Sequence, residues 1–156
     1  MHSSAAVANR FIDIARERGD TLTQMKLQKL VYIAHGWMLG LYGRRLISDR
    51  VEAWQYGPVV PALYRQLRHY RGEPIIENVA EPGGEPAFDD DELDVIRQVY
   101  DVYGRFSAVQ LSRMTHAPGT PWEQAYEPYE FSEVIPTDVI AEHYRRLAER
   151  SAERAA

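Results

Sequence analysis

Hydrophobic residues recur at helical spacing through most of this chain. Near its start, apolar side chains at i, i+4, i+7 and i+8 in residues 7–15 follow the candidate N-cap residues Ser3 and Ser4. Gly19 ends this pattern, as expected where a helix stops. A longer run over residues 27–41 has one broad apolar face. The first run predicts an amphipathic helix, and the second predicts the central, buried helix.

Two glycines, Gly36 and Gly40, lie inside the second run. In a helix interior each glycine costs about 1 kcal/mol relative to alanine. Such a cost is tolerated where another backbone must come close to the helix. We therefore expect a second element to pack against these two positions.

Short extended pieces follow the central helix. Residues 45–48 and 51–56 are two such pieces, and the polar residues 48–50 between them predict the turn of a small antiparallel hairpin. The pair Gly57-Pro58 predicts a further turn. Farther along, Ile75-Ile76 predicts a strand fragment that leads into an exposed loop.

Further helical periods occupy the rest of the chain. Pro61 is suited to a first helical turn, and the carboxylates of residues 89–91 favour the positive end of a helix. The predicted helices cover residues 61–70, 89–103 and 107–114, a single turn around 122–126, and a last helix over about 136–150.

These patterns together predict a mainly α protein. We expect about six helices with a small antiparallel β-hairpin or short sheet, in a single compact domain over residues 1–156. The part that bears the motifs described below spans about residues 22–126. A polar tail is expected at residues 151–156.

Composition narrows the classes of protein. The chain has no cysteine, which excludes a disulfide framework, a thiolate zinc site and a cysteine nucleophile, and which fits a reducing cytoplasm. No apolar run reaches the roughly 18 residues of a membrane span, so we expect a cytoplasmic protein without membrane insertion.

Charge is distributed unevenly along the chain. Residues 1–72 hold 11 Lys and Arg against 5 Asp and Glu, whereas residues 73–134 hold 3 against 14. The two parts either neutralise each other within the domain or form separate surfaces that steer a charged partner. Because the whole chain is acidic, with a sequence pI near 5.5, we do not expect it to bind nucleic acid.

Candidate catalytic and metal-binding residues are few. None of the five histidines lies at the short spacing that holds a metal, and no nucleotide-binding glycine motif is present, so no metal or cofactor is expected. Ser112 and His116 lie at i, i+4 and are the candidate nucleophile and base of a small hydrolase. No G-x-S-x-G turn or evident oxyanion hole accompanies them, so a local structural role is favoured and no catalytic residue is assigned.

Aromatic residues are abundant, with three tryptophans and ten tyrosines. Most belong to the core, but protein interfaces favour Tyr, Trp and Arg as anchors. A partner-binding surface is therefore predicted around the hairpin and the helix that follows it. Its expected residues are Tyr56, Tyr64, Arg65, Arg68, Lys26 and Lys29.

Three stretches, MKLQKLVYIAHGWMLGLYGRRL, VEAWQYGPVVPALYRQL and FSAVQLSRMTHAPGTPWEQAY, resemble in this order the Panacea domain, also described as SocA-like antitoxins and phage-associated proteins. The resemblance spans about residues 25–126 and implies no catalytic residue. It implies instead an antitoxin that neutralises a cognate toxin encoded beside it, in most members by direct contact. One SocA-like branch is understood to act as an adaptor that delivers its toxin to a ClpXP protease.

The matching motif positions are expected to define the shared fold rather than the contact with the toxin. They include Trp54, Gly57, Pro58, Thr115, His116, Gly119 and Trp122.

Three functions therefore stay open. The first is an antitoxin that covers its toxin with the predicted Tyr- and Arg-rich surface. The second is a protease adaptor, for which the terminal alanines of an unstructured ERAA end resemble a degradation tag. The third is a hydrolase with Ser112 and His116 in a cleft between Trp54 and Trp122. Self-association of the chain is a further possibility.

Overall fold

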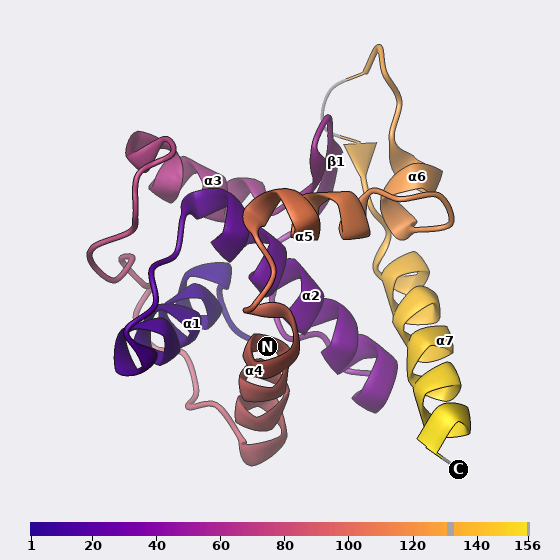
Figure 1. Cartoon of the computed structure of the whole chain (residues 1–156), viewed down its shortest axis with the longest axis horizontal. Helices are drawn as coiled ribbons and strands as arrows, with labels where there is room; N and C mark the ends of the chain where they lie inside the picture. The colour runs from indigo at the N-terminus through magenta and orange to yellow at the C-terminus, as the bar shows by residue number, and fades with distance from the viewer. Residues whose placement is uncertain (131–132, 156) are drawn as a thin grey trace.

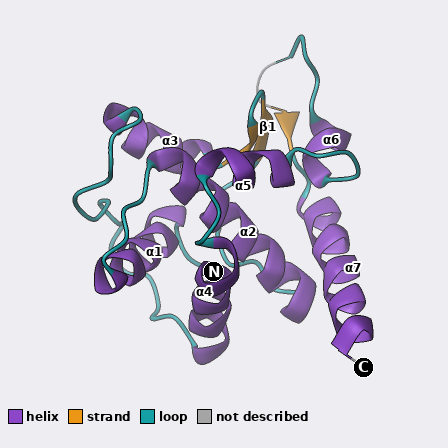
Figure 2. Cartoon of the chain, viewed as in Figure 1, coloured by secondary structure: helices purple, strands orange, loops and turns teal. Residues whose placement is uncertain are grey.

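A computed structural model describes residues 1–130 and 133–155 of the chain (Figure 1). Figure 2 shows mostly helices with a small sheet at one edge, so the predicted fold class is confirmed. The described residues form seven α-helices, one 3-10 helix and three strands, because the single turn expected around Trp122 is a helix of its own. In chain order the elements are α1 (Ser4–Arg18), α2 (Gln24–Tyr42), β1 (Glu52–Trp54), β2 (Gly57–Val59), α3 (Pro61–Leu67), η1 (Arg68–Tyr70), α4 (Asp90–Tyr103), α5 (Ala108–Thr115), α6 (Pro121–Ala125), β3 (Glu133–Val134) and α7 (Thr137–Ala155).

The helix α2 lies at the centre of the fold, as its broad apolar face predicts. It packs against α1, α4, α5 and α7, so apolar side chains on several of its sides are buried (Figure 1). Among them, Leu27, Leu30 and Met38 have no exposed surface. The predicted caps are present as well: Ser3 caps α1, and capping boxes begin α4 and α5.

The close approach predicted at Gly36 and Gly40 is confirmed. The partner is Tyr144 of α7: its ring lies over Gly36, and its backbone lies over Gly40. A Cβ atom added to Gly40 would stand 2.6 Å from the carbonyl carbon of Tyr144. The two glycines therefore allow α7 to lie directly on α2, with Tyr144 only 5% exposed.

The predicted position of the hairpin turn is wrong. Trp54 pairs with Gly57, so the turn lies at residues 55–56, and Gly57-Pro58 belongs to strand β2. Residues 45–48 do not pair with residues 51–56; Ile47 instead makes an isolated parallel bridge with His2. The N–H groups of Leu46 and Ile47 both donate to Nδ1 of His35, at 3.2 and 3.3 Å.

His35 is suited to accept both hydrogen bonds. Its side chain is buried in α2, and this burial, together with the charge of Arg45, lowers its pKa to about 4. The imidazole is therefore neutral at physiological pH, and Nδ1 keeps its lone pair. A core histidine thus shapes the connection between α2 and the hairpin.

The sheet contains a strand that the sequence pattern did not indicate. β3 pairs antiparallel with the outer side of β1, which gives the order β2-β1-β3. The strand fragment predicted at Ile75-Ile76 is absent. The N–H of Ile75 donates to the carbonyl of Leu22 in a loop, and Ile76 is 81% exposed.

The C-terminal helix is longer than predicted. α7 continues to Ala155, through the segment expected to be a polar tail. Alanine, glutamate and arginine dominate residues 151–155, and all three favour helices. None of the helices that the structure describes is long and apolar enough to cross a membrane.

The contact between α2 and α7 predicts the effect of a single methyl group. Gly40→Ala places a Cβ against the backbone of Tyr144, which cannot rotate away as a side chain can. We expect the free energy of unfolding to fall by about 1–3 kcal/mol, because overpacking outweighs the higher helix propensity of alanine. Urea denaturation measures this change.

Gly72→Ala is the matched control, because no atom lies within 4 Å of a Cβ added there. Its stability should stay within about 0.5 kcal/mol of that of the wild type. Equal stability of Gly40→Ala and Gly72→Ala would contradict the described approach of α7.

Candidate partner-binding site

Buried polar side chains of α2 hold the hairpin in place. The amide of Gln28 pairs with the backbone of Val60: Nε2 donates to the carbonyl at 3.1 Å, and the Val60 N–H donates to Oε1 at 3.0 Å. Next to it, Nζ of Lys29 donates to the carbonyl of Pro58 at 2.9 Å. Gln28 and Lys29 are 3% and 2% exposed. They satisfy backbone groups that the end of β2 leaves unpaired inside the protein.

Lys29 is therefore not on the surface, where a partner contact was expected. Burial lowers its pKa to about 8. No carboxylate forms an ion pair with it among the described residues, so the carbonyl of Pro58 is its hydrogen-bond acceptor.

The other side of the hairpin is held by α5 and α6. The hydroxyl of Ser112 donates to the carbonyl of Tyr56 at 2.6 Å. The indole Nε1 of Trp122 donates to the carbonyl of Trp54 at 2.5 Å. The backbone at both ends of the hairpin turn is thus fixed by residues that lie much later in the chain.

The remaining motif residues pack around these contacts. Gly57 has φ +117°, and a Cβ there would stand 3.2 Å from Nζ of Lys29 and 3.3 Å from Oγ1 of Thr115. The hydroxyl of Thr115 donates to the carbonyl of Leu111, and Gly119 has φ +84° in the turn before α6. His116 lies edge-on to Trp122, with 5.3 Å between the ring centroids. That these positions define the fold rather than the toxin contact stays a prediction.

The geometry of Ser112 and His116 gives a hydrolase little support. Their Oγ and Nδ1 atoms are 3.4 Å apart, but the Ser112 proton is directed to the carbonyl of Tyr56. Ser112 is only 6% exposed. In the part of the chain that the structure describes, no three His, Asp or Glu side chains lie together in a way that could hold a metal ion.

A cleft of about 780 Å³ opens between the start of α2, the hairpin and the segment after α6. Its lining includes the aromatic residues Trp54, Tyr56, Tyr64 and Tyr126. Trp54 and Tyr64 meet edge to face, with 4.9 Å between ring centroids, and Tyr126 stacks on Trp122 at 4.4 Å. Packed rings therefore form a large part of the cleft wall.

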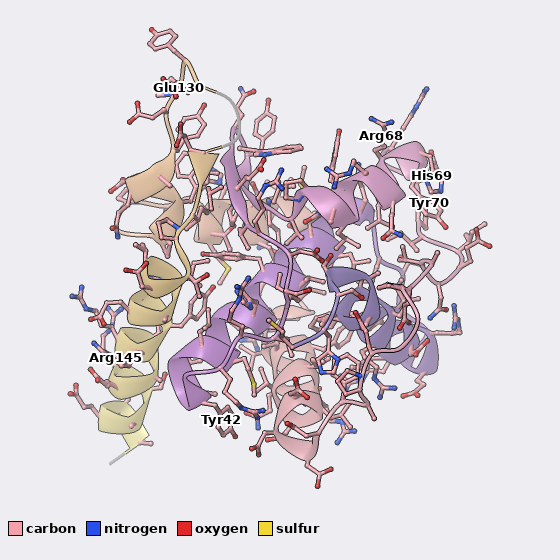
Figure 3. The ribbon with its side chains drawn as sticks, turned by 180° about the vertical axis from the view of Figure 1, so that it is seen from behind. Tyr42, Arg68, His69, Tyr70, Glu130 and Arg145 are labelled. Atoms are coloured by element: carbon pink, nitrogen blue, oxygen red, sulfur yellow. The ribbon has the colours of Figure 1, made fainter. Side chains whose placement is uncertain are left out.

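The structure brings only part of the predicted surface together. Tyr56 and Tyr64 line the cleft, whereas Arg65 and Arg68 are exposed on α3 and η1 outside it. Figure 3 shows Arg68 beside His69 and Tyr70, well apart from Glu130. The amine of Lys26 donates to the carbonyl of Gly104 at 2.5 Å, and its pKa is lowered mainly by burial.

Several cleft residues were missed from the sequence. Tyr126, Pro128 and Glu130 follow α6 and reach the hairpin only through the fold. Residues 126–130, YEPYE, have the polar composition of an exposed loop. Their only unusual feature for an exposed loop is the presence of two tyrosines in five residues. No signal in this segment indicates the element that it faces.

Comparisons with known proteins identify relatives of the chain. The family model "Antitoxin SocA-like, Panacea domain" matches residues 27–123. A curated relative, "Antitoxin SocA" of Caulobacter vibrioides (strain NA1000 / CB15N), is 36% identical over 126 residues, which cover 76% of this chain and 67% of the relative. No solved structure matches the chain significantly.

The buried amine of Lys29 predicts a pH-dependent stability. Its pKa is about 8 in the folded protein and about 10.4 in an unfolded chain. Between these values the unfolded state binds a proton that the folded state does not, so stability rises with pH. From pH 7.5 to pH 10, the wild type should gain about 2 kcal/mol relative to Lys29→Met.

Urea denaturation of both proteins across this pH range measures the difference. Arg65→Met, at an exposed position, serves as the control and should follow the wild-type pH dependence. Parallel curves for the wild type and Lys29→Met would show that the amine of Lys29 keeps an ordinary pKa.

Proposed function

This chain belongs to the SocA-like antitoxin family with the Panacea domain, and we propose that it neutralises a cognate protein toxin, encoded beside it, by direct binding. The family match and the similarity to a curated antitoxin support the antitoxin role. Direct binding requires a preformed surface that a partner recognises. The observation that carries this part of the proposal is the aromatic cleft beside the hairpin.

The chemistry of the cleft is that of a protein interface. Tyr and Trp are enriched among the residues that contribute most to binding energy. Tyr56 is 62% exposed at the hairpin turn, and Tyr64 and Tyr126 are partly exposed on the walls of the same cleft. A cleft of about 780 Å³ has room for several side chains of a partner segment.

The scaffold beneath these rings is firmly held. The side chains of Gln28, Ser112 and Trp122 each bond the backbone in or next to the hairpin. A surface that is ordered before binding loses less conformational entropy when the partner arrives. This preorganisation favours tight binding over a limited contact area.

The charged residues of the predicted surface divide into two groups. Arg65 is exposed on α3, and Arg68 is exposed on η1, which follows it. Because Tyr64 of α3 lines the cleft, we place both arginines at the border of the interface. Lys26 and Lys29 hold backbone carbonyls with their amines. Their contribution to binding is therefore indirect, through the position of the hairpin and of the end of α4.

A protease adaptor is the second candidate, because the chain is 36% identical to a protein named Antitoxin SocA and a SocA-like branch is understood to deliver toxins to a ClpXP-type protease. The terminal segment adds little support, since α7 is helical to Ala155. The half-life of the toxin distinguishes the two functions. An adaptor shortens it only in cells that contain the protease, whereas a sequestering antitoxin leaves it unchanged.

Replacing Tyr56 tests the proposed interface. Tyr56→Ala removes a ring that is 62% exposed, so the fold should be retained. If the ring anchors the toxin, the affinity should fall by about 10- to 100-fold. Calorimetry with the purified neighbouring protein measures the affinity, and coexpression measures the rescue of growth.

Tyr42→Ala is the matched control. Tyr42 is 43% exposed at the end of α2 that lies away from the cleft (Figure 3), and its loss should leave both readouts unchanged. If the wild-type chain fails to protect cells from the neighbouring protein, the antitoxin proposal itself is lost.

A further inference from the structure

We infer that the aromatic cleft receives a basic side chain, arginine or lysine, from the toxin. This inference rests on the proposed function and adds the chemistry of the contact. Two independent observations support it: the rings that line the cleft, and the unpaired carboxylates at its edge.

Aromatic rings attract cations through the negative faces of their π systems. Four such rings line the cleft: those of Trp54, Tyr56, Tyr64 and Tyr126. The indole Nε1 of Trp54 already donates to Oε1 of Glu52 at 3.0 Å. The donor of this tryptophan is thus occupied, and what it offers to a ligand is its ring. A guanidinium or ammonium group is suited to such walls.

One carboxylate lines the cleft, and a second interacts electrostatically with it and with a third. Glu130 belongs to the lining, and the pKa of Glu133 is raised, first by a hydrogen bond with Glu130 and then by burial and by the charges of Glu130 and Glu127. Glu133 thus contacts Glu130 and is within electrostatic range of Glu127. None of them forms an ion pair with the described residues, whereas Asp89 and Asp101 pair with arginines elsewhere. A cation from a partner would relieve this repulsion.

Lys29 does not cancel this charge within the cleft. It is the one cation among the described lining residues, but it is only 2% exposed. Its ammonium group is directed to the carbonyl of Pro58, beneath the strand. An anionic ligand would therefore meet the carboxylates before it met this amine, so the cleft favours a cation.

A peptide titration tests the inference without the toxin. The probe is acetyl-Gly-Arg-Gly-amide, and its control carries citrulline, which has nearly the shape of arginine but no charge. In NMR spectra of the full chain, the indole N–H signals of Trp54 and Trp122 should shift saturably with the arginine peptide. The citrulline peptide should bind at least about tenfold more weakly. Equal binding of both peptides, or no binding of either, would overturn the inference.

Two carboxylates at the edge can be neutralised without touching the core. Glu127→Gln/Glu130→Gln changes two exposed residues and should weaken the binding of the arginine peptide several-fold. At high salt the difference in affinity from the wild type should be smaller, because salt screens exposed charges. Glu73→Gln/Glu153→Gln changes two exposed carboxylates elsewhere and should have no effect. Thermal unfolding of both variants confirms that the fold is kept.

The toxin provides a separate readout. Glu127→Lys/Glu130→Lys should reduce toxin affinity by at least about tenfold, while the wild type still rescues growth. If the wild type rescues growth and this charge reversal binds the toxin equally well, the inference is wrong and the proposed function stands. If the wild type does not rescue growth, the antitoxin function and the inferred toxin contact both fail, whatever the peptide titration shows.

Discussion

The buried polar contact between α2 and the hairpin is the interaction on which the candidate site depends. Strands of three residues are too short to be stable on their own, so the hairpin needs support from outside the sheet. Gln28 and Lys29 provide it from within the core, where an unpaired backbone group would be costly. The wall formed by Trp54 and Tyr56 takes its position from these bonds.

The same principle operates farther along α2. His35 accepts hydrogen bonds from the backbone of the irregular segment 46–47, as Gln28 bonds the backbone of Val60. Both side chains are buried among apolar residues of the same helix. One central helix thus packs the core with its apolar residues and positions two non-helical segments with its polar ones. Part of the stretch MKLQKL also lines the cleft, through Met25, Gln28 and Lys29.

The parts of the fold that follow from local periodicity could be predicted from the sequence. The helices and the close approach at Gly36 and Gly40 are examples, because helical spacing and glycine cost are properties of neighbouring residues. The hairpin position could not be predicted, since it depends on hydrogen bonds from Ser112 and Trp122, which lie far away in sequence. The burial of Lys29 was missed because a lysine is ordinarily exposed. Three cleft residues were missed because Tyr126, Pro128 and Glu130 reach the hairpin only through the fold.

The folded structure also separates the two interpretations of the uneven charge. Arg18 pairs with Asp101 and Arg44 with Asp89, so part of the basic first half neutralises the acidic middle within the domain. The carboxylates beside the cleft form no ion pair among the described residues, and neither do Arg65 on α3 and Arg68 on η1. Acidic charge therefore lies at the cleft, and basic charge lies outside it on α3 and η1. A partner with complementary charges would be attracted in one orientation and repelled in the reverse one. On this surface, the rings would provide the binding energy and the charges would select the orientation.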